Sequence, residues 1–347
     1  MLRFCAGLIA VVVFALSQAV ADPIQGSGST FVYPLIQRAS GEYQVFLSGD
    51  GDFTTNDNAV SYEPVGSLGG ILRLQRPEID FAASDYPLSV AELDKAGFAQ
   101  FPIVAGAIAV VVNIPTLEKT KINMSASVLA DIYLGKIQNW IDPAIAKANQ
   151  GVAFPDLPIV VVARLDGSGS TFNWTSYLSQ ANTEWREKYG AANLVSWPLG
   201  KAVKGGGAVA AEVKATAGAI GYVEFGQAQR AGLNIAMVGL VDGSFSAPDK
   251  ASISAAINGS DLKAETHFAT SLINSKAAGA YPISAVTYAI MRRNSGRAAG
   301  HSRALRFFNY VYQHSDQTAL DLGFVPLPEA AAKTVNAYWA SAFRNGS

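Results

Sequence analysis

The chain has 347 residues, of which 50% are hydrophobic and 15% charged, and its formal net charge is −1. That length makes about two domains of ordinary size, and the apolar content is far above that of a disordered chain. A net charge so close to zero excludes a broad basic field for nucleic acid. The single cysteine, Cys5, excludes an internal disulfide and a cysteine-rich metal site.

The first 21 residues have the pattern of a secretory signal peptide. Arg3 supplies a positive start, residues 6–16 form an unbroken apolar run, and Ala19-Val20-Ala21 matches a small-x-small cleavage site. The run is shorter than the about 20 residues that a membrane-spanning helix needs. A buried N-terminal helix is the alternative. Cleavage after residue 21 would remove Cys5 and Arg3, and would leave an exported, periplasmic chain with a net charge of −2.

The later patterns alternate between helix and strand. In chain order they predict a helix around 32–43, a strand at 103–112, a helix at 127–134, strands at 158–163, 219–225 and 285–291, and helices at 301–314 and 330–343. The strands are apolar throughout, which is typical of a parallel sheet buried on both faces. The alternation predicts an α/β fold with mainly parallel sheets. The polar stretch 48–61 is predicted to be an exposed loop or hairpin.

Three turns rich in glycine and serine each precede a predicted helix. They lie at 26–31, 66–70 and 166–172, and the third follows the strand 158–163 directly. Such a turn presents unpaired backbone N–H groups and short hydroxyls at the positive end of a helix dipole, which suits an anion. One turn of this kind is also an ordinary helix cap. Three in one chain favour convergence on a common ligand.

Arg164 ends the strand before the third turn, at the sheet edge where α/β proteins bind ligands. Its guanidinium can hold a tetrahedral oxyanion through two parallel hydrogen bonds. Asp166, two residues later, is predicted to hold Arg164 in place. The alternative is a plain surface ion pair, which contributes about 0–1 kcal/mol.

Asp85 follows another predicted strand end, and a carboxylate beside an anion site restricts which anion fits. Phosphate keeps a proton near neutral pH and can donate a hydrogen bond to a carboxylate, whereas sulfate has no proton and cannot. Asp85 would therefore admit phosphate and reject sulfate. The alternative is that Asp85 caps a helix that begins near Ser89.

Six segments together resemble the periplasmic phosphate-binding proteins of high-affinity phosphate ABC transporters. They appear in that family's order over nearly the whole mature chain, with Tyr281-Pro-Ile283 as a further match. The segments are 26–31, 66–70, 81–89, 131–137, 164–172 and 218–224.

The resemblance implies a two-lobed periplasmic binding protein of type II, each lobe a mixed, mainly parallel sheet flanked by helices, with two hinge crossings. Residues 22–104 and 284–347 would form lobe 1, and 105–283 lobe 2. Inorganic phosphate would lie between the lobes of a monomer that delivers it to a membrane permease. The family needs no cofactor and no metal, and binds no nucleic acid.

The resemblance also implies the site residues. The matching positions for phosphate are Thr30, Phe31, Ser67, Asp85, Arg164, Ser168, Gly169 and Ser170, with Asp166 orienting Arg164. Two positions depart from the family. Ser170 stands where threonine is common and keeps the hydroxyl, whereas Leu68 replaces a serine beside Ser67 and would change loop packing. The stretch 48–61 is longer than is usual. The basic, glycine-rich segment 201–207 is predicted to be a solvated loop, and a segment that faces the cleft is the alternative.

A secreted phosphatase and an extracellular phosphate-binding surface or adhesion protein are the alternatives. Phosphoester hydrolysis needs an activated nucleophile or a metal-bound water. The three histidines, His267, His301 and His314, lie outside the three turns without metal-ligand spacing. The last two are predicted on an exposed helix face. A site of fixed donors also binds its ground state tightly, which opposes turnover. The sequence therefore favours binding without chemistry.

Overall fold

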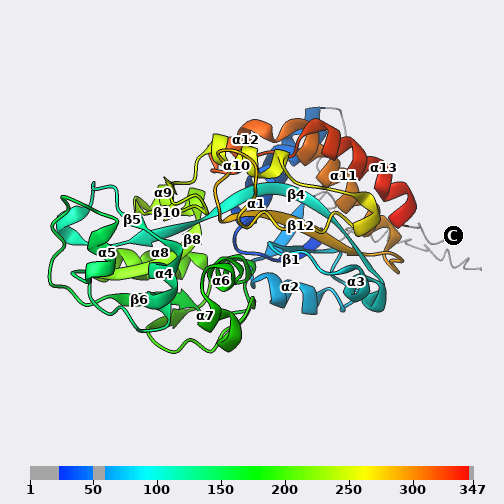
Figure 1. Cartoon of the computed structure of the whole chain (residues 1–347). Coiled ribbons are helices and arrows are strands. Elements are labelled where there is room, and N and C mark those ends of the chain that lie inside the picture. The colour runs from blue at the N-terminus through cyan, green and yellow to red at the C-terminus, as the bar shows by residue number, and fades with distance from the viewer. Residues whose placement is uncertain (1–22, 50–58, 344–347) are drawn as a thin grey trace, which may run out of the picture.

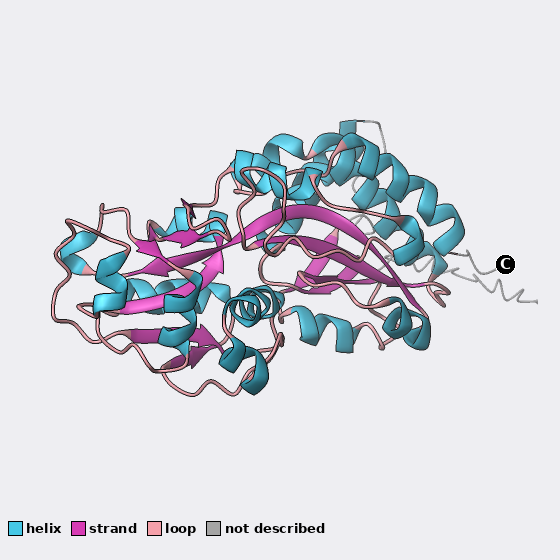
Figure 2. Ribbon diagram, in the orientation of Figure 1, coloured by secondary structure: helices cyan, strands magenta, loops and turns pink. Residues whose placement is uncertain are grey.

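A computed structural model describes residues 23–49 and 59–343 of the chain. Figure 1 shows two groups of helices and strands side by side, joined by the long strand β4 (Phe98–Val112), which runs from one group into the other. Helices flank the strands in both groups (Figure 2). The molecule is therefore a two-lobed α/β protein, as the sequence predicts.

The elements follow one another in short alternations of helix and strand. The strands are β1 (Ile24–Gly28), β2 (Val60–Glu63), β3 (Phe81–Ser84), β4 (Phe98–Val112), β5 (Asn123–Met124), β6 (Val160–Arg164), β7 (Lys201–Val203), β8 (Ala219–Glu224), β9 (Asn234–Ile235), β10 (Met237–Gly239), β11 (Phe245–Ser246) and β12 (Ser284–Arg292).

The described residues also form thirteen α-helices. They are α1 (Tyr33–Gly49), α2 (Ser67–Arg73), α3 (Val90–Ala96), α4 (Ala126–Tyr133), α5 (Pro143–Lys147), α6 (Gly169–Ala181), α7 (Thr183–Lys188), α8 (Gly206–Ala215), α9 (Phe225–Ala231), α10 (Lys250–Asn258), α11 (Ala298–His314), α12 (Asp316–Asp321) and α13 (Glu329–Ala342), and 3₁₀ turns lie at η2 (Pro115–Leu117) and η3 (Ala264–Thr266).

Within the described residues the main sheet has nine strands, with the order β2-β1-β3-β12-β4-β8-β6-β7 and β9 added beside β4. One end is parallel through β2, β1 and β3, and the other through β8, β6 and β7. We call the first end with α1–α3 and α11–α13 lobe 1, and the second end with α4–α9 lobe 2. Each lobe thus has its own parallel strands covered by helices.

The strand β4 belongs to both lobes. Its first part pairs with β12 up to Ala107, and its last part pairs with β8 from Ile108 onward. All 15 of its residues are buried, which agrees with the apolar run that predicted a strand. The expectation of parallel pairing is wrong for β4 and β12, which run antiparallel to their neighbours. Burial on both faces produces the same apolar pattern in either direction, so the pattern could not decide it.

Two of the sequence expectations lie outside the described residues: the signal peptide up to residue 21, and most of the stretch 48–61. The described part of that stretch is the end of α1 and the start of β2. Within residues 23–49 and 59–343, no helix is both long and apolar enough to cross a bilayer.

The lobe boundaries at 104/105 and 283/284 stay a prediction. The first falls inside β4, near the point where its partner changes from β12 to β8. Before the second, η3 packs on α13, and the ring of Phe268 lies 5.2 Å from that of Tyr338. Contacts with lobe 1 therefore begin before residue 283.

The prediction for the two helical histidines holds for one of them. His314 is exposed. His301 is instead only 3% exposed, and its Nε2 donates to the carbonyl of Arg292 at 3.1 Å. It faces the core because α11 packs against β1 and β4. A backbone carbonyl on β12 satisfies the ring nitrogen there, as buried polar atoms require.

The lobes also touch where α9 meets the turn after α12. A Cβ atom on Gly226 would lie 1.7 Å from the carbonyl oxygen of Leu322, which leaves no room for a side chain. Arg230 of α9 donates to the same carbonyl at 2.9 Å. The backbones of the two lobes are thus in direct contact at this point.

We expect Gly226→Ala to lower the free energy of unfolding by about 1–3 kcal/mol, because the methyl group forces α9 away from Leu322. The matched control is Gly41→Ala on the exposed face of α1, where a Cβ meets nothing within 4 Å. That change should stabilise by about 0.5–1 kcal/mol through helix propensity. Thermal unfolding of both variants measures the effects. Equal melting temperatures of the two variants would contradict a tight contact between Gly226 and Leu322.

Candidate functional site

The three glycine- and serine-rich turns meet at the junction of the lobes. The first joins β1 to α1, the second precedes α2, and the third begins α6 with Ser168 as its N-cap. The second and third turns touch directly. The Gly169 N–H donates to Ser67 Oγ at 3.1 Å, and the Leu68 N–H donates to the Gly167 carbonyl at 3.3 Å. The convergence predicted from the sequence is therefore present, and it joins lobe 1 to lobe 2.

Two glycines make this approach possible. Gly66 has a φ of 88°, and a Cβ there would lie 2.6 Å from the Gly167 carbonyl oxygen. A Cβ on Gly169 would lie 2.6 Å from the Cβ of Asp85. Any side chain at either position would hold the turns apart, so glycine is required. Leu68, the departure noted in the sequence, packs against Gly167 at this contact.

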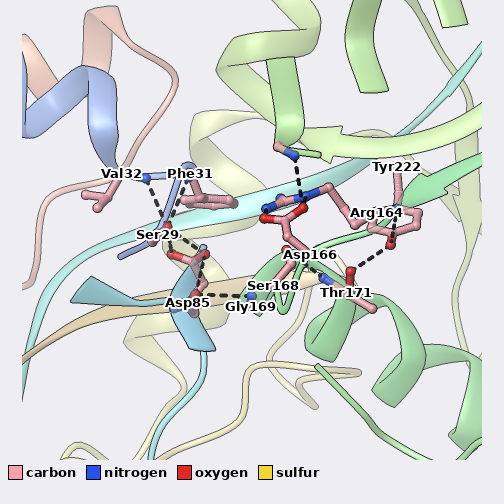
Figure 3. Close-up of polar contacts among 12 residues, drawn as sticks. Ser29, Phe31, Val32, Asp85, Arg164, Asp166, Ser168, Gly169, Thr171 and Tyr222 are labelled. Carbon is pink, nitrogen blue, oxygen red and sulfur yellow. Dashed lines mark hydrogen bonds and ion pairs between the residues drawn. The ribbon is translucent and has the colours of Figure 1, made fainter. Parts of the chain in front are cut away.

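Arg164 carries its charge inside the protein. It ends β6, its side chain is 2% exposed, and its Nε donates to Asp166 Oδ1 at 2.7 Å while Nη2 contacts Oδ2 (Figure 3). The Gly205 N–H also donates to Asp166 Oδ1, at 2.9 Å. Burial raises the pKa of Asp166, but these donors outweigh it and hold the pKa below its usual range. The pair is thus buried and bidentate, and the alternative of a surface ion pair is wrong.

The segment 201–207 is not the solvated loop expected from its composition. Its first residues form β7, which pairs with β6, and Gly205 is the N-cap of α8. The Gly205 N–H is the group that donates to Asp166. Glycine and lysine content alone predicts an exposed loop. The segment begins as a strand instead, because β7 pairs with β6, the strand that ends in Arg164.

Asp85 lies across the junction from Arg164, directly after β3, and is 3% exposed. Its Oδ1 accepts from Ser29 Oγ at 2.6 Å and from Thr287 Oγ1 at 2.8 Å. Its Oδ2 accepts from Ser29 at 2.7 Å and from Ser67 at 3.4 Å. Burial raises the pKa of Asp85 to about 6, although the hydroxyl donors and Arg164 oppose the rise. The alternative role as a helix cap is excluded, because Ser89 caps α3.

The remaining predicted residues surround the same junction. Phe31 is buried, its ring packs on Phe324, and its N–H donates to Ser29 Oγ at 3.0 Å. Thr30 faces lobe 2, since its Oγ1 lies 3.8 Å from the place a Cβ on Gly206 would take. Ser170 is 5% exposed in the first turn of α6. The structure thus brings both lobes' candidate residues to one place.

Sequence reasoning did not single out Ser29 and Thr287, the closest hydroxyl donors to Asp85. Ser29 stood inside the first motif but was treated as a turn residue. Thr287 is a fully buried hydroxyl within the apolar run that predicted β12. A polar residue inside an otherwise apolar strand is a signal of a buried hydrogen-bond partner, which the pattern contained.

Two aromatic side chains, Tyr222 and Trp197, form a wall that is hydrogen-bonded to the backbone of Arg164. The Arg164 N–H donates to the Tyr222 hydroxyl at 3.3 Å, and Trp197 Nε1 donates to the Arg164 carbonyl at 2.8 Å. Tyr222 also shares a hydrogen bond of 2.7 Å with Thr171 in the first turn of α6. Burial raises the pKa of Tyr222 to about 12, so its hydroxyl stays neutral. The wall fixes the backbone of Arg164 relative to α6.

The site can bind an anion that carries a proton. Arg164 supplies positive charge, the N-terminus of α6 supplies backbone N–H groups, and Asp85 supplies an acceptor. A fully deprotonated anion would set its lone pairs against those of Asp85.

The raised pKa of Asp85 predicts a stability change with a definite sign. Between about pH 4 and pH 6 the folded state binds the proton more readily than the unfolded state, so stability falls as the pH rises through this window. At a pH where the Asp85 carboxylate is charged, its burial lowers the free energy of unfolding by about 3 kcal/mol, and Asp85→Asn removes this cost. We expect the unliganded variant to be more stable than the wild type at pH 8 and about equal to it at pH 4.

Urea unfolding at both pH values measures this difference. Asp261→Asn is the control, because that side chain is 70% exposed and the substitution makes the same change in net charge. A variant Asp85→Asn that is less stable than the wild type at pH 8 would show that burial does not disfavour the Asp85 carboxylate.

The chain resembles known proteins over most of its length. A family model described as a PBP superfamily domain matches residues 15–315. The phosphate-binding protein PstS of Xylella fastidiosa strain Temecula1 is 37% identical, with 94% of this chain and 87% of the relative covered. PstS of Pasteurella multocida is 35% identical, with 94% and 92% covered.

Solved structures share the fold. A phosphate-binding protein from Stenotrophomonas maltophilia superposes with a TM-score of 0.71 at 20% identity, with 91% of this chain and 93% of that chain covered. A high-affinity periplasmic phosphate-binding protein bound with phosphate, PfluDING, gives a TM-score of 0.70 at 23% identity, with 91% and 93% covered. Together with the sequence relatives, these similarities show that the chain belongs to the PBP superfamily and, within it, to the family of the PstS phosphate-binding proteins.

Proposed function

We propose that this chain binds inorganic phosphate between its lobes in the periplasm and delivers it to the membrane permease of an ABC transporter. The observation that carries the proposal is that a buried Arg164 of lobe 2 and a buried Asp85 of lobe 1 lie at the same junction, close enough for the Arg164 charge to oppose the rise of the Asp85 pKa. An arginine alone accepts many oxyanions, whereas the added carboxylate selects those that can donate a hydrogen bond. The names of the PstS relatives support the same ligand.

In the proposed complex the ligand lies among groups from both lobes. Lobe 1 would provide the Thr30 hydroxyl, the Phe31 N–H, the Ser67 hydroxyl and the Asp85 acceptor. Lobe 2 would provide the Arg164 guanidinium and the N–H and hydroxyl groups of 168–170. Asp166 accepts hydrogen bonds from Arg164 and from the Gly205 N–H, so it would orient the guanidinium and would not contact the ligand.

The lobes would close around the ligand and exclude water. The contact between the second and third turns in the structure is the closed arrangement that this requires. The two lobes hold complementary parts of the site, so only a closed molecule offers the complete set. The permease would then recognise the closed conformation, which the protein adopts with phosphate bound. We propose binding without chemistry by a monomer, with no cofactor or metal in the site.

Thermal unfolding with added anions tests the ligand. Phosphate at 100 times its Kd should stabilise the wild type by about 2.7 kcal/mol, and sulfate at equal ionic strength should not. Asp85→Asn should weaken the discrimination against sulfate, because its amide can donate to a deprotonated oxygen. Ser170→Thr is the matched control, since it keeps the hydroxyl and should keep the preference. Equal shifts by phosphate and sulfate in the wild type would contradict the role of Asp85.

A phosphoester assay separates binding from catalysis. The purified protein should not turn over a chromogenic phosphate monoester, because a site that binds the ground state tightly opposes turnover. The Arg164→Ala variant is the control for contaminating phosphatase. Sustained hydrolysis in the wild type that is lost in this variant would favour the secreted phosphatase instead.

A further inference from the structure

Ser29 occupies the centre of the hydrogen bonds around Asp85. It lies between β1 and α1 and is fully buried. Its hydroxyl donates to the two carboxylate oxygens of Asp85 at 2.6 and 2.7 Å, and it accepts from the N–H of Phe31 at 3.0 Å (Figure 3). A weaker contact of 3.4 Å reaches the N–H of Val32. The hydroxyl is therefore both a donor and an acceptor inside the site.

Its two main partners are the groups that the proposed function assigns to the ligand. Phosphate would accept a hydrogen bond from the Phe31 N–H and donate one to Asp85. A serine hydroxyl can do both at once, as a protonated phosphate oxygen can. The hydroxyl of Ser29 thus makes the same pair of hydrogen bonds as the ligand would.

We propose that Ser29 is an internal competitor of phosphate that sets the affinity of the site. The inference rests on the proposed function and deepens it. The ligand must displace the hydroxyl from Asp85 and from the Phe31 N–H before it can use them. Since Ser29 pairs with those two groups in the structure, part of the binding free energy would be spent on breaking these hydrogen bonds.

The other donors to Asp85 do not compete in this way. Thr287 contacts only Oδ1, at 2.8 Å, from β12, which pairs antiparallel with β3 next to Asp85. Ser67 contacts Oδ2 at 3.4 Å and also accepts from the Gly169 N–H. Neither side chain pairs with the Phe31 N–H. They hold the carboxylate in orientation while the hydroxyl of Ser29 gives way.

The competing role and a plain structural role predict opposite changes in affinity. A serine that only shapes the turn before α1 would, when replaced, disorder the site and weaken phosphate binding. A competitor would, when replaced, leave the Phe31 N–H without its acceptor and Asp85 with only Thr287 and Ser67 as side-chain donors, and would thereby strengthen binding. The unliganded variant should then be less stable, while phosphate should raise its melting temperature by more than it does in the wild type.

The test is calorimetric titration of inorganic phosphate into ligand-stripped Ser29→Ala at pH 8. We expect a Kd about three- to tenfold lower than that of the wild type. Ser27→Ala is the matched control: Ser27 is also fully buried, two residues earlier, and its hydroxyl has no hydrogen-bond partner among the described residues. Its Kd should stay within about twofold of the wild-type value.

A Kd for Ser29→Ala that equals or exceeds the wild-type value, with phosphate still bound by the wild type, would overturn this inference alone. A wild type that binds no phosphate would overturn the proposed function and this inference together. Ser29→Gly removes the same hydroxyl and should tighten binding in the same direction. It decides the question if the alanine variant does not fold.

Discussion

The site depends on a buried carboxylate that faces a buried guanidinium across the junction of two lobes. Each charge alone would be strongly disfavoured inside a protein, and each has its own set of partners. In lobe 2, Asp166 is the counterion of Arg164, and the Gly205 N–H donates to Asp166. In lobe 1, Asp85 accepts hydrogen bonds from the hydroxyls of Ser29, Thr287 and Ser67. Both lobes therefore bring a charge that is already neutralised or hydrogen-bonded, and a ligand bound by both would be selected by its proton.

The fold supplies these partners through a few strand ends. Arg164 ends β6, Asp85 follows β3, and Thr287 lies on β12, whose antiparallel pairing with β3 sets its hydroxyl beside the carboxylate. The strand β4 continues from lobe 1 into lobe 2 and joins the two parallel ends of the main sheet. The proposed selectivity is accordingly local, and the net charge of the chain, close to zero, has little bearing on it.

Residue patterns predicted most of the fold and the residues that meet at the junction of the lobes, whose contacts with phosphate stay a proposal. The three turns, Arg164 with Asp166, and Asp85 at a strand end were all recognisable because glycine, serine and charge at the end of an apolar run have few other uses. The direction of β4 and β12 was not predictable, since burial on both faces erases any periodicity. Ser29 and the Gly205 N–H were missed for a related reason: their roles depend on which segment packs opposite, and local sequence does not contain that information. The buried hydroxyl of Thr287 was visible as a polar residue in an apolar strand, but its partner Asp85 was not.

The most direct test of the account is a crystal structure of the protein with phosphate. The account predicts one phosphate between the lobes, with an oxygen about 2.5–2.7 Å from a carboxylate oxygen of Asp85 and others at hydrogen-bonding distance from Arg164 and the first turn of α6. The Ser29 hydroxyl should have left Asp85. A phosphate bound away from Asp85, or one whose oxygens contact only Arg164 and the turns, would contradict selection by the proton.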